Sequence, residues 1–268
     1  MRVVPWTELC AGQQKIDGRV RLTVGVFDGL HLGHRALLNG IIRSPGPATA
    51  LVVTFSRNPQ QVLAPGRFPG LILSYRQKLA RLAELGVDAT VVIDFSDEMS
   101  NLSGKAFISL LRENLDIEKI VVGENFRFGR SREAGSGDLK KMLFNTGIEV
   151  QVSQPVLKDD AVVSSSRIRK TIQEADFAEA RAMLLADYIL DLRGVAGRKK
   201  GAGTMLFERS DIQQVLPAAG RYGVRCDHDG TSCDAELDVL ADALLLTCGC
   251  RQEATTVTFH GKESDTCH

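Results

Sequence analysis

Two histidines stand in a glycine-punctuated segment near the amino terminus, which runs from Gly25 to His34 with the sequence GVFDGLHLGH. His31 and His34 are three positions apart, so they share one face if a helix begins here. Each imidazole can donate a hydrogen bond to a phosphate oxygen, and the first N–H groups of a helix add partial positive charge. Gly29 and Gly33 permit a close approach of the backbone to a ligand. The segment therefore predicts a phosphate-binding turn.

The same spacing has simpler interpretations. Taken alone, two histidines three residues apart are more often surface residues, or ligands of one metal ion. The chain has only five histidines, however, and two of them stand where a β-rich run gives way to an amphipathic one. Ligands of open α/β sheets bind beyond the carboxyl ends of the strands. This context favours a nucleotide, bound by Gly25, Phe27, Asp28, Gly29, His31 and His34.

A second candidate site is the segment VSSSRIR, from Val163 to Arg169. Ser166 is predicted to cap the amino end of a helix, with neighbouring hydroxyl and N–H groups at the same end. Arg167 and Arg169 can neutralise a polyphosphate. The alternative is an ordinary capped helix with two exposed arginines. Together with the histidine segment, we expect a clamp for a leaving pyrophosphate.

The first part of the chain alternates β-rich runs with amphipathic stretches, which is typical of a parallel sheet with crossover helices. The β-rich runs are nearly continuous in apolar residues, as strands buried on both faces are. They cover residues 21–27, 50–55, 89–95, 119–123 and 149–152. Segments with helical spacing begin near Gly33, Ser74, Ser103 and Gly137. We predict an α/β fold with a Rossmann-like doubly wound parallel sheet.

The character of the sequence changes after two short helical segments at 167–174 and 176–185. Glycines then cluster around the basic run Arg198-Lys199-Lys200, and later runs such as 221–226, 243–248 and 255–259 are typical of short antiparallel strands. A second, smaller β-barrel-like domain is expected. We place the first domain at residues 1–185 and the second at residues 186–268.

These segments resemble the bacterial bifunctional riboflavin kinase/FAD synthetases, whose amino-terminal module is an adenylyltransferase with a His-x-Gly-His motif. The resemblance covers about the first 190 residues. The segments that carry it are, in order, 25–34, Thr54-Phe55 with Asn58-Pro59, 86–88, 123–129 and 164–169. Three of these segments identify the family, but only in combination. They are residues 25–34, NFRFG and SSSRIR. The resemblance implies transfer of AMP from ATP to FMN, giving FAD and pyrophosphate with Mg²⁺ assisting.

The resemblance also implies roles for individual residues. His31 and His34 would stabilise charge on the phosphates, and Arg167 with Ser165 and Ser166 would hold the β- and γ-phosphates of ATP. Asn125 would lie at the ATP and metal region. The flavin would be bordered by Phe55, Arg57, Asn58, Pro59 and Phe128.

The flavin assignments depart from the family pattern. An acidic residue and a histidine of the family's segment are replaced in the sequence that runs from Thr54 to Pro59. Arg57 is expected to meet the FMN phosphate instead. For Phe55 and Phe128, a place in the hydrophobic core is an equally good interpretation.

The kinase motif of the family, Pro-Thr-Ala-Asn, aligns here with Gly203-Thr204-Met205-Leu206, in which only the threonine is kept. Leu206 has no oxygen for Mg²⁺. We therefore expect no riboflavin kinase activity. The alternatives are a working bifunctional enzyme, an adenylyltransferase for another phosphorylated acceptor, and a flavin- or nucleotide-binding regulator without catalysis.

Composition limits the partners and the compartment. The chain has 33 Lys and Arg against 33 Asp and Glu, so no overall field favours nucleic acid. No apolar run approaches the ~18 residues of a membrane span and no secretory signal is visible, so we expect a cytoplasmic protein. No obligate protein partner is indicated. Five of six cysteines fall in the last fifth of the chain, but Cys226, Cys233, Cys248 and Cys250 lack the spacing of a zinc knuckle, and support for zinc is weak.

Overall fold

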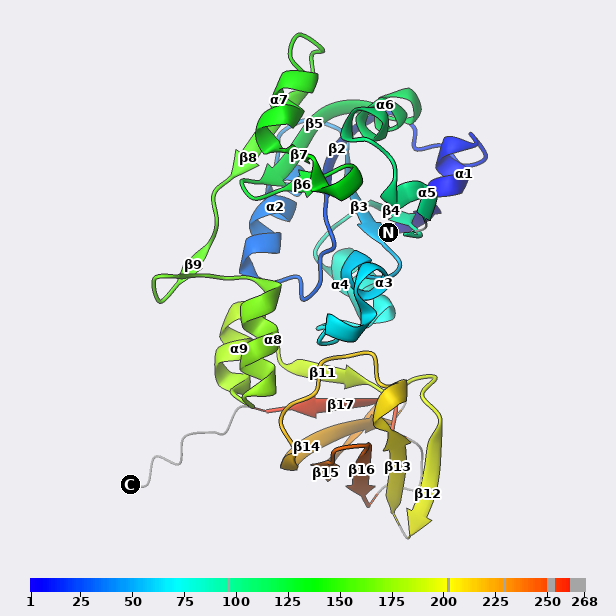
Figure 1. The fold of residues 1–268 in the computed structure, drawn as a ribbon, viewed down its shortest axis with the longest axis vertical. Coiled ribbons are helices and arrows are strands. Elements are labelled where there is room, and N and C mark those ends of the chain that lie inside the picture. Colours follow the sequence, from blue (N-terminus) through cyan, green and yellow to red (C-terminus); the bar gives the residue numbers. More distant parts are fainter. Residues whose placement is uncertain (96, 202, 229, 250–253, 261–268) are drawn as a thin grey trace. The chain divides into compact units, whose positions relative to one another are not determined.

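The computed structural model describes residues 1–95, 97–201, 203–228, 230–249 and 254–260 (Figure 1). The chain divides into two compact units. The first comprises Met1–Phe68 and Lys78–Val162, and the second comprises Pro69–Gln77 and Val163–His268. The domain boundary between residues 185 and 186 stays a prediction. The structure groups the two helices before that boundary with the second unit.

The first unit is built on six parallel strands in the order β1-β4-β3-β2-β5-β8. Their bounds are β1 Arg2–Pro5, β2 Arg19–Val24, β3 Thr49–Phe55, β4 Ala89–Ile93, β5 Asp116–Gly123 and β8 Glu149–Ser153. The five predicted strands are present. The edge strand β1 was not expected, because four residues beside a short helix give little periodicity to detect.

Helices cover both faces of this sheet. The main ones are α1 Trp6–Cys10, α2 Leu32–Ile42, α4 Tyr75–Glu84, α6 Gly104–Asn114 and α7 Ser136–Met142. One core cluster joins alternate strand residues such as Val20, Leu22 and Val24 with residues of α6 and α7. On the opposite face, α2 approaches β5 so closely that a Cβ on Gly40 would lie 3.0 Å from Val121 Cγ1. The prediction of a doubly wound sheet is confirmed.

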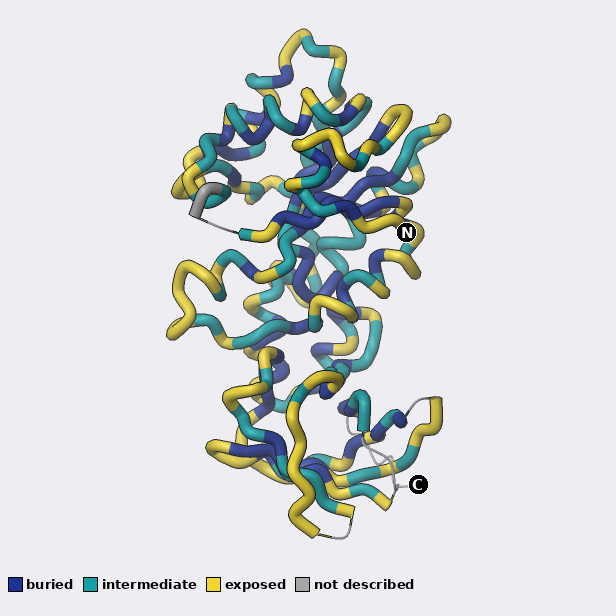
Figure 2. The backbone as a smooth tube through the Cα atoms, turned by 90° about the vertical axis from the view of Figure 1, so that its right-hand side faces the viewer, coloured by how far each residue is buried: buried dark blue, intermediate teal, exposed yellow. Residues whose placement is uncertain are grey.

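Short elements connect these layers. They are α3 Pro59–Leu63, α5 Asp97–Ser100, the 3₁₀ turns Pro65–Arg67 and Arg130–Arg132, and the two-residue strands β6 Arg127–Phe128, β7 Ala134–Gly135, β9 Leu157–Lys158 and β10 Ala161–Val162. Buried residues follow the sheet, and most connections are half-buried or exposed, although the loop between β2 and α2 is largely buried (Figure 2). Because the strands are fixed by burial on both faces, the loops at their ends are held by a rigid base.

The second unit contains the helices α8 Ser165–Gln173 and α9 Phe177–Leu184 and an antiparallel sheet of seven strands. The order is β11-β17-β14-β15-β16-β13-β12, and the smaller β domain is thereby confirmed. Bounds are β11 Tyr188–Asp191, β12 Gly197–Gly201, β13 Thr204–Glu208, β14 Gly220–His228, β15 Thr231–Val239, β16 Ala243–Cys248 and β17 Thr256–Phe259, with a 3₁₀ turn at Arg209–Asp211. Phe177 stacks on Phe259 at a centroid distance of 4.7 Å and joins helix to sheet.

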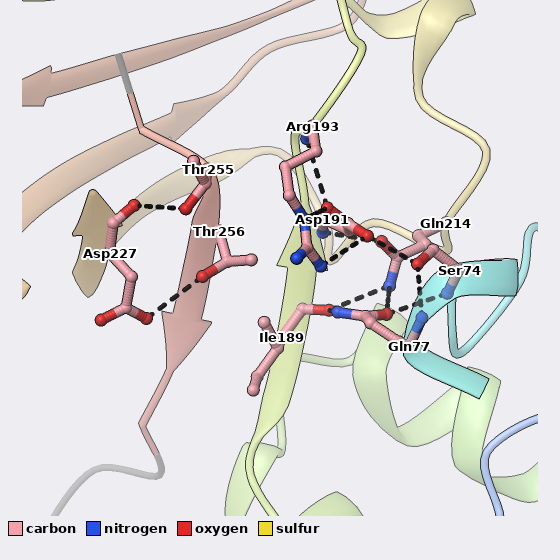
Figure 3. Close-up of polar contacts among 9 residues, drawn as sticks. All are labelled: Ser74, Gln77, Ile189, Asp191, Arg193, Gln214, Asp227, Thr255 and Thr256. Atoms are coloured by element: carbon pink, nitrogen blue, oxygen red, sulfur yellow. Dashed lines mark hydrogen bonds and ion pairs between the residues drawn. The ribbon is translucent and has the colours of Figure 1, made fainter. Parts of the chain in front are cut away.

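A polar network ties the segment 69–77 to β11 within the second unit (Figure 3). Gln214 is buried, and its side-chain nitrogen donates to the carbonyls of Ile72 and Ile189 at 3.0 and 2.9 Å. Ser74 donates to Asp191 at 2.6 Å, and Asp191 also accepts from Arg193. These bonds explain why nine residues from the middle of the α/β sequence pack with the β sheet.

Candidate nucleotide-binding site

The loop between β2 and α2 has an unusual backbone. Phe27, Gly29 and Leu30 have φ angles of 53°, 95° and 46°, all in the left-handed region. Phe27 and Leu30 are not glycines, so their conformation costs energy that the surrounding packing must supply. Both side chains are wholly buried, and this burial holds the loop in place. Strained backbone of this kind concentrates at functional sites.

Gly25 is required by packing at the start of this loop. A Cβ at this position would lie 3.1 Å from the ring of Phe27. The Phe27 ring in turn faces the imidazole of His34, with centroids 5.1 Å apart. Thus the predicted residues Gly25, Phe27 and His34 form one packed group. Asp28, between them, is buried at 4 % exposure.

His31 and His34 lie side by side. Their rings stack with centroids 3.7 Å apart and an interplanar angle of 22°. His31 is the N-cap of α2, and its Nδ1 accepts a hydrogen bond from the backbone N–H of His34 at 3.4 Å. A neutral His31 therefore carries its proton on Nε2. The cap fixes the ring and leaves Nε2–H as the donor.

The imidazole of His34 is held neutral. Burial, and secondly the neighbouring His31 and Lys78, lower the pKa of His34 well below its usual value. Its Nδ1 is buried and has no hydrogen-bond partner among the described residues. At neutral pH this side chain is a neutral donor or acceptor. A buried polar atom of this kind is suited to a ligand that supplies the missing hydrogen bond.

Lys78, on α4, is the residue that the sequence reasoning missed. Its Nζ donates to the carbonyl of Phe55 at 2.6 Å and lies 3.4 Å from the carbonyl of Val26. Burial lowers the pKa of Lys78 to about 8, and the charge of Asp28 opposes this shift. The available signal was its position four residues before the buried Leu82, which places a lysine on the buried face of the helix.

The order of strands places these groups at the ligand-binding edge of the sheet. From β2 the chain adds β3 and β4 on one side, then crosses to add β5 on the other. Open α/β sheets bind ligands at such a switch point, beyond the carboxyl ends of the strands. The histidine loop follows β2, and the exposed Asn125 follows β5, directly beside it in the sheet. The histidine loop and Asn125 therefore lie at the same edge of the sheet.

Four of the five predicted flavin residues lie at the end of β3 or directly after it, at the same edge of the sheet. Phe55 is half-buried and packs edge-on against Phe95 with centroids 5.8 Å apart. Arg57 is exposed and forms an ion pair with Asp94 at 3.5 Å. Phe128, by contrast, is only 7 % exposed and belongs to the hydrophobic core. Phe128 thus lies in the hydrophobic core, which was the alternative interpretation of this residue. Phe55 and Arg57 stay accessible to solvent.

Asn58 and Pro59 have a clear local role. Asn58 is the N-cap of α3, and its side-chain oxygen accepts from the backbone N–H of Gln60 at 3.0 Å. Pro59 is the first residue of that helix, where its missing N–H costs nothing. Their residue types are therefore accounted for by the start of α3. A contact with flavin stays a prediction for both.

The second candidate segment opens α8. Its N-cap is Ser164, whose Oγ accepts from the backbone N–H of Arg167 at 3.2 Å. The prediction that Ser166 caps the helix is wrong, because the helix already includes Ser165 and Ser166. Arg169, which the sequence suggests could neutralise a polyphosphate, is only 5 % exposed and donates to the carbonyl of Gly70 at 2.8 Å. It serves the second unit's packing.

Arg167 has a different environment from Arg169. Its side chain is 25 % exposed and pairs with Glu179 of α9 at 2.8 Å. The pair fixes the guanidinium beside the first turn of α8, where Ser165 and Ser166 also lie. This segment belongs to the second unit, and the histidine loop belongs to the first.

Residues 13–167 match the family model described as FAD synthetase. This match covers more than half of the 268 residues, and the chain belongs to the FAD synthetase family. The relative from Escherichia coli (strain K12), named bifunctional riboflavin kinase/FMN adenylyltransferase, is 32% identical over 76% of this chain and 66% of its own. A Listeria monocytogenes relative of the same name is 31% identical over 76% of this chain and 67% of its own.

The matched part thus spans about two thirds of the length of these relatives. A crystal structure described as a macrolide-efflux protein from Streptococcus pneumoniae has a TM-score of 0.78 and 23% identity, and covers 97% of this chain and 89% of that one. This likeness shows the fold. No helix within the described residues has the length and apolar character to cross a membrane.

Proposed function

We propose that the chain is an FMN adenylyltransferase. An oxygen of the FMN phosphate attacks the α-phosphorus of ATP, the bond from that phosphorus to the bridging oxygen breaks, and pyrophosphate leaves with the bond's electrons. FAD and pyrophosphate are the products. The observation that carries this proposal is the stacked pair of His31 and His34 in a strained loop at the switch point of a FAD synthetase family fold.

The roles of these groups follow from their protonation. His31 is positioned by its cap bond to donate from Nε2–H to a phosphate oxygen. His34, held neutral by burial, donates or accepts without adding a second buried charge. The charge of Lys78 acts on His34, and it would add positive charge where negative charge accumulates on the phosphates. The Ser165, Ser166 and Arg167 segment would hold the β- and γ-phosphates.

Magnesium is part of the proposal. Mg²⁺ in phosphoryl-transfer sites is usually held by one or two carboxylates together with substrate phosphates and water. The buried carboxylate of Asp28 and the exposed amide of Asn125 are oxygen donors that suit it. The ion would neutralise charge on the phosphates of ATP. On the flavin side, the proposal assigns Phe55 and Arg57 as the accessible contacts, with Asn58 and Pro59 beside them.

We further propose that the second unit does not phosphorylate riboflavin. Thr204 starts β13, and its Oγ1 lies 3.2 Å from that of Thr247 on β16. Leu206 shares its face of the strand, so no oxygen stands where the family's asparagine would. The missing oxygen ligand at Leu206 supports the absence of a Mg²⁺-nucleotide site.

One experiment tests both parts. Purified full-length protein is incubated with ATP, Mg²⁺ and either FMN or riboflavin, and the flavins are separated by chromatography. We expect FAD from FMN, with pyrophosphate released in equal amount, and unchanged riboflavin. Absence of FAD would overturn the main assignment. Steady formation of FMN from riboflavin would overturn the statement about the second unit.

A further inference from the structure

Three potential metal ligands gather on neighbouring strands of the second unit. They are His228 at the end of β14, Cys233 in β15 and Cys248 at the end of β16. Their donor atoms all lie within 4.8 Å of one another. The three strands are adjacent in the sheet. The sequence provides only weak support for zinc at Cys233 and Cys248, because their spacing is not that of a knuckle, and it does not indicate His228.

The register of the strands places all three side chains on one face. Cys226 stands opposite Cys233, and His228 is two residues beyond Cys226. Ala235, two residues beyond Cys233, stands opposite Cys248. Because side chains alternate along a strand, Cys226, His228, Cys233 and Cys248 share the inner face of the sheet. The cluster lies at the end of the buried row.

The distances suit a tetrahedral ion. His228 Nε2 lies 3.7 Å from Cys233 Sγ and 3.9 Å from Cys248 Sγ. With zinc bonds of ~2.3 Å to sulfur and ~2.0 Å to nitrogen, tetrahedral ligands stand about 3.5 Å apart. Contraction by a few tenths of an ångström around an ion would meet this geometry. Thiolate and imidazole ligands in such an arrangement favour Zn²⁺ over harder cations.

Burial of His228 gives a second, independent reason. Its side chain is 2 % exposed, and its Nδ1 is buried with no hydrogen-bond partner among the described residues. The contacts that its Nε2 makes in the structure are with two sulfur atoms, which are weak hydrogen-bond partners. An ion bound between the three side chains would give Nε2 a much stronger partner than the two thiols do.

The backbone around the cluster is well held. Asp227, next to His228, accepts from Thr256 at 3.1 Å, and its carbonyl accepts from the Thr255 hydroxyl at 2.9 Å (Figure 3). Ser232 donates to the same carboxylate. These bonds join β14, β15 and β17 beside the cluster, so His228 and Cys233 are held in fixed positions. Pre-positioned ligands bind an ion without paying for local ordering.

We propose that His228, Cys233 and Cys248 form a structural zinc site that joins β14, β15 and β16 at the end of the sheet where β14 and β16 end. A tetrahedral ion needs a fourth ligand. Cys226 faces the same side of the sheet, but it is not in the group whose donor atoms all lie within 4.8 Å of one another. Cys250 follows two residues after Cys248 but lies outside the described residues. The site is independent of the adenylyl transfer and belongs to the second unit alone.

The first test uses the wild-type protein. It is expressed with added zinc and purified with a thiol reductant, and its metal content is measured by mass spectrometry. We expect about one zinc per chain. After removal of zinc with a chelator, Co²⁺ should give the near-ultraviolet thiolate charge-transfer band and the strong visible bands of a tetrahedral site. Failure of wild-type protein to retain zinc and to show the thiolate band overturns the proposal.

Substitutions then assign the ligands. Cys233→Ser and Cys248→Ser should each weaken Co²⁺ binding by more than about 100-fold, since loss of outer-sphere partners alone costs about 10- to 100-fold. Cys10→Ser, a half-buried cysteine of the first unit, is the matched control and should leave binding unchanged. Equal binding by Cys233→Ser, Cys248→Ser and the control overturns the site, as does a Cys233–Cys248 disulfide whose reduction yields no metal-binding protein.

Discussion

Replacement of His31 separates its two roles, because the structure assigns one nitrogen to each. Nδ1 accepts the cap bond from the His34 backbone N–H, and the proposed function assigns Nε2–H to a phosphate oxygen. In His31→Asn, the side-chain oxygen can keep the cap, since asparagine is among the best N-cap residues, but it cannot replace the Nε2 donor. In His31→Ala both functions are lost.

The expected magnitudes differ between stability and turnover. The cap bond is long at 3.4 Å, so its loss in His31→Ala should cost ~0.5–1 kcal/mol, at the lower end of measured caps. For a chain of this size that lowers the melting temperature by about 1–4 °C. Losing a donor to charge that builds in the transition state costs about 100- to 1,000-fold in turnover. His31→Asn should therefore melt near the wild-type temperature and still lose that turnover.

The assay is FAD formation from FMN and ATP, with pyrophosphate release as a second readout, beside thermal unfolding of the same preparations. FMN binding, measured by quenching of flavin fluorescence, should change far less than turnover. Near wild-type turnover in His31→Asn would refute the assignment of Nε2–H to the phosphates. A loss of turnover confined to His31→Ala would show that the residue acts only as a cap.

Three further predictions concern charge. The free energy of unfolding of Lys78→Met should be compared with that of wild type at two pH values. The difference in favour of Lys78→Met should be larger at pH 7 than at pH 10.5, by up to about 3 kcal/mol. The folded pKa of Lys78 is lowered to about 8, so the cost of its buried charge is complete below that pH and is relieved toward 10.5. Proton resonances of the His34 ring should stay constant from about pH 8 to pH 6, because its pKa lies well below the usual value. Arg167→Ala should raise the KM for ATP by about 10- to 100-fold, whereas Glu179→Gln, which also breaks the ion pair, should not.

Each of these has a contrary outcome. A stability difference between Lys78→Met and wild type that does not vary with pH would show that Lys78 titrates near its ordinary value. A ring shift of His34 near pH 6.5 would place a charged imidazole in the site. Equal KM changes in Arg167→Ala and Glu179→Gln would make Arg167 a residue that only joins α8 to α9.

Local pattern was enough to predict the elements. The strands of the parallel sheet are continuous apolar runs, and α2, α4, α6 and α7 begin near the predicted residues, because burial on both faces and capping chemistry leave a periodic signal. The histidine loop could be located for the same reason: glycine spacing after an apolar strand is local information. The shared face of His31 and His34 follows from their spacing of three.

Residue environments were harder to predict where a distant partner decides them. The N-cap of α8 is Ser164 and not the predicted Ser166. Both belong to a run of three serines, and any of the three has a side chain that can cap a helix. Arg169 lies buried because the carbonyl of Gly70, 99 positions away, accepts its hydrogen bond. Phe128 is a core residue because α6 packs on it. None of these partners is marked in the local sequence.

The sequence by itself determined the fold class, the family and the position of the histidine loop, because those depend on apolar periodicity and on a contiguous motif. Only the tertiary structure decided that Lys78 joins the histidine pair, and that His228, Cys233 and Cys248 meet on one face of a sheet. Both groupings depend on strand order and register, which bring residues together across long separations. Spacing along the chain carries no record of such contacts.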